Sequence, residues 1–74
     1  MITVYSAPEC HACDDLKDYF RRKGVSFDAR DITKSAADMA FAQKWGCSVP
    51  LTRIGNQVVV GFNKTELNRL LGLR

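Results

Sequence analysis

The sequence predicts an α/β protein with the element order βαβαββα, in which a four-stranded mixed sheet is flanked by three helices. A strand-like run, a helical pattern and a second strand-like run open the chain; the turn signal Gly55-Asn56 separates two later strand-like runs; three stretches place apolar residues at helical spacing. The opening unit implies a parallel pair, and the turn implies an antiparallel hairpin. A sheet with helices on both faces is the simplest arrangement that buries the apolar face of each of the three helices.

The composition is that of a small soluble globular protein. The 74 residues include 46% hydrophobic and 26% charged side chains, and no repeat or linker divides them, so we expect one domain over residues 1–74. No apolar run approaches the roughly 20 residues of a membrane helix, and no basic-then-apolar leader opens the chain. Three cysteines are an odd count that suits a reducing compartment. We therefore expect a cytoplasmic monomer.

The first half of the chain predicts a strand, a helix and a strand. Residues 1–6 are rich in β-branched and aromatic side chains, and Pro8 breaks that strand because proline cannot continue a hydrogen-bonded ladder. From residue 10 to about residue 23, apolar positions recur at helical spacing, and Gly24 provides a stop. Residues 25–30 alternate between apolar and polar side chains and predict the second strand.

A second helix is predicted after a short linker at residues 31–33. Ser35 begins a capping-box pattern, the apolar positions continue through Trp45, and Gly46 ends the helix. Phe41 and Trp45 are four residues apart, so they share one helix face. We expect both aromatic side chains to belong to the core.

The remainder of the chain predicts a hairpin and a third helix. The strand-like residues 51–54 and 57–60 flank the turn signal and should pair antiparallel. Residues 61–62 are expected to form a loop. Asn63, with an acidic residue three positions later, is a helix cap, and Gly72 closes the helix that follows.

The reactive side chains are concentrated in Cys10-His11-Ala12-Cys13, between the first strand and the first helix. A thiol at a helix N-terminus faces unpaired backbone N–H groups and the positive end of the helix dipole, which favour the thiolate and lower the thiol pKa. The second thiol lies one turn later and can attack a mixed disulfide formed by the first. This arrangement predicts dithiol–disulfide exchange. His11 is either an exposed first-turn residue or a cation that lowers the Cys10 pKa further.

Two further motifs accompany the cysteine pair: Val49-Pro50 before the third strand, and Val60-Gly61-Phe62 before a capped, leucine-rich helix. With these motifs the whole chain resembles a thioredoxin-fold protein of the glutaredoxin branch, and within that branch the NrdH-type redoxins. The resemblance implies a thiol–disulfide oxidoreductase that reduces protein or glutathione mixed disulfides. It implies that Cys10 is the nucleophile, that Cys13 is the resolving cysteine, and that Pro50 is a cis proline beside them.

The same resemblance implies the residues that bind substrate. Val49 corresponds to a residue whose backbone pairs with a bound thiol peptide like an added strand. Gly61, Phe62 and Asn63 lie where glutathione-using members bind the γ-glutamyl end, although Phe62 is as consistent with a core position. The predicted substrate- or glutathione-binding residues are Pro8, His11, Ser48, Val49, Pro50, Gly61, Phe62 and Asn63. No metal and no bound cofactor is expected.

Three departures from the glutaredoxin pattern bear on the reductant. Ala7-Pro8-Glu9 lacks the lysine that often precedes the first cysteine of glutathione-using members, and Glu9 adds a negative charge. Gly61-Phe62-Asn63-Lys64 replaces a Gly-Gly and acidic pair, and His11-Ala12 replaces a common Pro-Tyr. We expect glutathione or an NADPH-dependent flavoprotein thioredoxin reductase as reductant. Disulfide-containing proteins are the expected substrates, with ribonucleotide reductase as a client that the resemblance implies.

Other interpretations of these residues remain open. A thioredoxin-fold binding module could hold zinc through the three cysteines and His11, or carry an iron–sulfur cluster. Residues 47–49 are expected to be extended, with Cys47 buried under the loop as a small apolar side chain; an exposed Cys47 would instead be a regulatory or dimer-forming thiol.

The net charge of +3 is mild, and Arg21-Arg22-Lys23 is its main cluster. This run is either the solvated end of the first helix or a contact for an acidic protein partner. Nucleic acid is not an expected partner, because its recognition needs a broader basic face.

Overall fold

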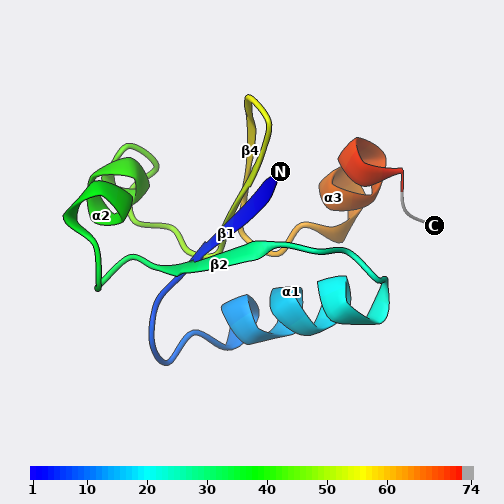
Figure 1. Ribbon diagram of the computed structural model, residues 1–74, viewed down its shortest axis with the longest axis horizontal. Coiled ribbons are helices and arrows are strands. Elements are labelled where there is room, and N and C mark those ends of the chain that lie inside the picture. Colours follow the sequence, from blue (N-terminus) through cyan, green and yellow to red (C-terminus); the bar gives the residue numbers. More distant parts are fainter. Residues whose placement is uncertain (73–74) are drawn as a thin grey trace.

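The structure is a computed structural model that describes residues 1–72. Its elements in chain order are β1 (Ile2–Ser6), α1 (His11–Arg22), β2 (Asp28–Asp31), α2 (Ala36–Gln43), β3 (Leu51–Ile54), β4 (Gln57–Val60) and α3 (Lys64–Leu71) (Figure 1). The strands form one sheet in the order β2-β1-β3-β4, with β1 parallel to β2 and antiparallel to β3. The predicted fold class is confirmed. Residues 73 and 74 of the predicted domain lie outside the described residues.

The sheet separates two apolar clusters. One lies between the sheet and helices α1 and α3, and consists of Val4, Leu16, Tyr19, Phe20, Val59 and Leu67. The other lies on the α2 side, and consists of Tyr5, Ile32, Ala42 and Leu51. Successive residues of a strand point to opposite faces, so β1 contributes to both clusters. Figure 1 shows α2 and α3 on opposite sides of the strands. Each fully buried leucine or phenylalanine contributes about 1.5–3 kcal/mol.

Local signals fix the ends of the helices. The hydroxyl of Ser35 accepts the N–H of Asp38 at 3.3 Å, and the side-chain oxygen of Asn63 accepts the N–H of Glu66 at 3.2 Å. Such caps typically contribute about 1 kcal/mol each. At the other end of α1, the predicted stop Gly24 adopts φ +70°, a left-handed conformation that glycine takes without steric cost.

The second strand begins later than predicted. β2 starts at residue 28 and includes Asp31, whereas the sequence favoured a strand over residues 25–30 and a linker from Asp31. The N–H of Val25 donates to the carbonyl of Phe20 at 2.8 Å, which holds this segment against the end of α1. Val25 and Phe27 are partly buried against the first cluster. Their apolar side chains therefore pack beside the helix end before the chain reaches the sheet.

The second helix is shorter than predicted. α2 ends at Gln43, and the N–H of Trp45 donates to the carbonyl of Ala42 in a tighter, three-residue turn. This turn takes Trp45 off the helical stripe, and the residue is 42% exposed. Phe41 instead stacks on Tyr5, with ring centroids 4.6 Å apart. The predicted core position is right for Phe41 and wrong for Trp45.

The segment that follows α2 also differs from the prediction. Cys47 has a left-handed backbone with φ +55°, so residues 47–49 are not extended throughout. Its N–H donates to the carbonyl of Ala42 at 2.9 Å, which turns the chain back toward the helix end. The residue is exposed and its thiol is not in a disulfide. The prediction of a buried Cys47 is therefore wrong.

Candidate active site

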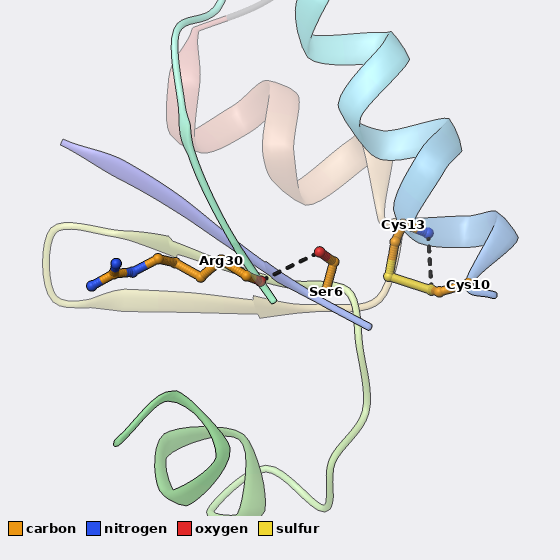
Figure 2. Close-up of a disulfide and its surroundings, with 4 residues drawn as sticks. All are labelled: Ser6, Cys10, Cys13 and Arg30. Atoms are coloured by element: carbon orange, nitrogen blue, oxygen red, sulfur yellow. Dashed lines mark hydrogen bonds between the residues drawn. A yellow bond between two sulfur atoms is a disulfide. The ribbon is translucent and has the colours of Figure 1, made fainter. Parts of the chain in front are cut away.

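The Cys-x-x-Cys pair lies at the start of α1. Cys10 is the N-cap residue with an extended backbone, and Cys13 lies in the first turn. Their sulfur atoms are joined in a disulfide, and their Cα atoms are 5.2 Å apart. Figure 2 shows this disulfide at the beginning of α1, beyond the end of β1. The first turn of the helix therefore brings both thiols within bonding reach of each other.

The sulfur of Cys10 is placed to carry a negative charge after reduction. The backbone N–H of Cys13 donates to the Cys10 Sγ at 3.1 Å, and this sulfur lies at the positive end of the helix dipole. Both effects favour the thiolate. Cys13 is only 1% exposed, whereas Cys10 is partly exposed. An incoming disulfide can therefore reach Cys10 more readily than Cys13.

Exposed carboxylates surround this end of α1. Glu9 precedes the N-cap with a left-handed backbone, φ +60°, and Asp14 and Asp15 follow in the first turns. These charges oppose the helix dipole at the Cys10 sulfur. Water and salt screen exposed charges strongly. The hydrogen bond from Cys13 acts at contact distance, so we expect it to outweigh the carboxylates.

The sheet brings two other predicted segments to the same edge. β1 runs into the cysteine loop, and its residue Tyr5 is paired with Leu51 at the start of β3. Pro50 precedes Leu51, so it lies at the edge from which the cysteine loop leaves. The N–H of Gly61 donates to the carbonyl of Pro50 at 2.8 Å, which places the end of β4 there as well. The Val49–Pro50 bond is cis, as the resemblance implied.

The predicted binding residues differ in what they offer to a ligand. Pro8, His11 and Ser48 are exposed. Val49 is partly buried against the second cluster, and its N–H donates to the carbonyl of Cys47 at 3.0 Å. The side-chain oxygen of Asn63 is already the acceptor that caps α3.

Phe62 packs against the core and also borders an open surface groove. It is partly buried and packs against the first cluster, with its ring centroid 5.7 Å from that of Tyr19. It also lines a surface groove of about 540 Å³ with residues of α1 and with Lys64. Phe62 therefore contributes to the core and to the wall of this groove.

Two polar residues near the site were not singled out from the sequence. The Tyr19 hydroxyl donates to the side-chain oxygen of Asn68, which ties α1 to α3 across 49 sequence positions. The Ser6 hydroxyl donates to the Arg30 carbonyl at 3.3 Å and holds the end of β1 against β2 (Figure 2). Tyr19 occupies an apolar helical position and Ser6 a strand end, and neither pattern signals a partner distant in sequence.

Charged side chains line a second pocket beside the cysteine loop. This pocket, of about 370 Å³, is bounded by residues of the loop, of α1 and of β2, among them Glu9, Lys17, Arg30 and Asp31. The hydroxyl and N–H of Thr33 both donate to the Asp31 carboxylate and hold its pKa below the ordinary value. Asp31 therefore stays ionised at mildly acidic pH.

Residues 1–72 contain neither a cluster of metal ligands nor a helix that could span a membrane. No three potential metal-ligating side chains lie in one cluster in this part of the chain. The described helices include none long and apolar enough to cross a membrane.

Comparisons with known proteins agree with this geometry. A protein-family model described as Glutaredoxin matches residues 2–59. An uncharacterised glutaredoxin-like 8.6 kDa protein from the rubredoxin operon of Clostridium pasteurianum is 34% identical, over 96% of this chain and 97% of that protein.

Solved structures show the same architecture. A point mutant of the thioredoxin-like protein BC3987 has a TM-score of 0.89 at 29% identity, over 99% of this chain and 96% of that chain. The NrdH-redoxin from Escherichia coli has a TM-score of 0.84 at 23% identity, over 93% and 92% of the two chains, and thus shares the fold. Because the family model spans most of the sequence, and the sheet, helices and Cys-x-x-Cys position agree with it, this chain belongs to the glutaredoxin family within the thioredoxin-like fold.

Proposed function

We propose that the protein is a dithiol–disulfide oxidoreductase in which Cys10 is the nucleophile and Cys13 the resolving thiol. The observation that carries this proposal is the asymmetry of the pair. The Cys10 sulfur is partly exposed at a helix N-terminus and accepts a backbone N–H, whereas Cys13 is buried directly behind it. An exposed, stabilised thiolate suits attack, and a protected neighbour suits resolution.

The proposed reaction transfers two electrons from the dithiol to a substrate disulfide. The Cys10 thiolate attacks one sulfur of the substrate, which breaks the substrate S–S bond, forms a mixed disulfide and releases one substrate thiolate. The Cys13 thiolate then attacks the Cys10 sulfur, which releases the second substrate thiol and forms the Cys10–Cys13 disulfide. The oxidised form is the one that the structure contains.

The surrounding residues support binding of an extended substrate segment. Pro8, His11 and Ser48 are accessible, and the N–H of Gly61 donates to the Pro50 carbonyl at the same end of the sheet. The N–H of Val49 is already donated to Cys47. In this proposal the carbonyl of Val49 therefore makes the strand-like contact with the substrate backbone.

We further propose a flavoprotein thioredoxin reductase, with NADPH as electron source, as the favoured reductant over glutathione. The segment Ala7-Pro8-Glu9 lacks the lysine that glutathione-using relatives often carry two or three residues before the first cysteine, and Glu9 adds a negative charge there. The side-chain oxygen of Asn63 is committed to the α3 cap. The proposed substrates are disulfide-containing proteins. Ribonucleotide reductase is proposed as one of them because the chain resembles the NrdH-type redoxins. The proposed setting is a reducing cytoplasm, with the protein acting as a monomer and without a bound cofactor.

An NADPH-coupled assay tests these proposals with a mixed-disulfide substrate. It is run once with glutathione and its reductase, and once with thioredoxin reductase. We expect faster NADPH consumption in the second arm, complete loss with Cys10→Ser, and little change with the matched control Cys47→Ser. Full turnover by Cys10→Ser would refute the mechanism. Faster turnover in the glutathione arm would refute only the choice of reductant.

A further inference from the structure

We propose that the groove between α1 and the start of α3 binds an acidic, extended segment of the protein whose disulfide reacts at Cys10. The groove has a volume of about 540 Å³ and is lined by Asp15, Asp18, Arg21, Arg22, Phe62 and Lys64. This inference rests on the proposed oxidoreductase function. It adds the chemistry of the partner and the position of its charges.

The walls of the groove are held in place before a partner arrives. The hydrogen bond from Tyr19 to Asn68 joins the two helices, and the rings of Tyr19 and Phe62 are in tilted contact. The Lys64 ammonium lies 5.4 Å from the Tyr19 centroid and 5.5 Å from the Phe62 centroid. Such cation–π contacts restrain a side chain that is otherwise flexible. A restrained cation loses less conformational entropy on binding an anion.

The charge along the groove favours an acidic partner. Arg21 and Asp18 form an ion pair at 3.1 Å and largely offset each other. Arg22 and Lys64 also line an adjoining pocket of about 330 Å³, together with Tyr19 and Lys23.

Cations therefore outnumber carboxylates at the end of the groove farthest from the cysteines. Asp15 lies nearer the cysteine end, so acidic residues close to the reacting cysteine of a partner would be repelled. This arrangement of charges affects the choice of partner and the rate of association more than the affinity.

The helix sets the spacing that the partner must match. His11, Asp15, Asp18 and Arg22 follow one another at intervals of four, three and four residues, which places them along one face of α1. Arg22 follows Cys10 by 12 positions, or roughly 18 Å along a helix. An extended chain covers that distance in about five or six residues. Glutamates five and six positions from the partner's cysteine would therefore reach Arg22 and Lys64.

A binding experiment tests the groove without any redox step. The oxidised protein, labelled with ¹⁵N, is titrated with an acetylated Glu-rich peptide that lacks cysteine. We expect amide shifts in residues 15–23 and 62–65, loss of those shifts in Arg22→Gln/Lys64→Gln, and their retention in the equal-charge control Lys34→Gln/Lys44→Gln. Shifts that persist in Arg22→Gln/Lys64→Gln, or that fall mainly elsewhere, would overturn the inference.

A kinetic experiment links the groove to the reaction. Two peptides carry one cysteine as a mixed disulfide with 2-nitro-5-thiobenzoate and differ only in having Glu or Gln five and six positions away. We expect kcat/KM to be about tenfold higher for the Glu peptide at low salt, with the advantage lost at about 0.5 M salt and in Arg22→Gln/Lys64→Gln.

The outcomes separate the two proposals. Equal reduction of both peptides would overturn the groove inference while leaving the oxidoreductase function intact. Failure to reduce either peptide would overturn the oxidoreductase function, and the peptide titration would still decide whether the groove binds an acidic segment.

Discussion

The hydrogen bond between Tyr19 and Asn68 provides a quantitative test of how the fold supports the site. Tyr19→Phe removes only the hydroxyl and retains the ring, which packs against Phe20 and Phe62 in a residue that is 7% exposed. A neutral side-chain hydrogen bond contributes about 0.5–1.5 kcal/mol net. For a domain of this size, a loss of about 1 kcal/mol lowers Tm by about 4–8 °C. It also lowers the urea midpoint by about 1 M if m is about 1 kcal/mol/M.

A double-mutant cycle separates this bond from other effects of the substitutions. Tyr19→Phe, Asn68→Ala and the double variant are unfolded in urea as oxidised proteins, in a Cys47→Ser background that prevents intermolecular disulfides. We expect the double variant to lose less stability than the sum of the single variants, by about 1 kcal/mol. Additive losses, with a coupling below about 0.3 kcal/mol, would show that the bond does not hold α1 and α3 together.

Three further predictions concern the reactive pair and its surroundings. Cys13→Ser should accumulate a mixed disulfide at Cys10, visible as an added substrate mass under non-reducing conditions; recovery of unmodified protein alone would contradict the resolving role. His11→Pro tests the interpretation in which the His11 side chain stabilises the Cys10 thiolate: its removal should make the dithiol more reducing and shift the equilibrium with a glutathione redox buffer toward the oxidised protein. An unchanged equilibrium would remove His11 from the mechanism. Thr33→Val should raise the pKa of Asp31 toward its ordinary value in a ¹³C NMR titration. Because the folded pKa is depressed, the stability that Thr33 contributes is present above the ordinary pKa and lost as pH falls through the folded one; an equal loss of stability at all pH values would exclude this linkage.

The parts of the fold that the sequence predicts correctly are those decided within a few residues. The hairpin strands β3 and β4 occupy the predicted ranges because a two-residue turn fixes both the register and the ends of the pair. Ser35 and Asn63 cap their helices because the capping oxygen and the N–H it accepts are three residues apart. The predicted start of the first helix at Cys10 is correct to within one residue, because Cys10 is the N-cap of α1.

The errors arise where distant contacts or backbone conformation override a local pattern. Alternation at residues 25–30 resembles a strand, yet Val25 and Phe27 are used to pack against α1. Trp45 follows Phe41 at helical spacing, but the helix tightens and ends before reaching it. The left-handed backbone of Cys47 has no sequence signal, because cysteine is not among the residues that favour this conformation, and the sequence therefore did not decide between a buried and an exposed Cys47.

The end of the sheet beside the cysteines depends both on local sequence signals and on pairing between distant strands. The sequence alone puts Cys10 at a helix start, because strand, proline and helical periodicity are adjacent in the chain. The arrival of Pro50 and Gly61 at that edge depends on β3 pairing antiparallel with β1 and on the bond from Gly61 to the Pro50 carbonyl. Changes in the hairpin turn, far from the cysteines, should therefore alter substrate binding by shifting the register of β3. Changes in the first turn of α1, where the Cys13 N–H donates to the Cys10 sulfur, should act mainly on thiol reactivity. The hairpin and the first turn of α1 are different elements of the fold, so substitutions in one should affect its own property of the site more than the other.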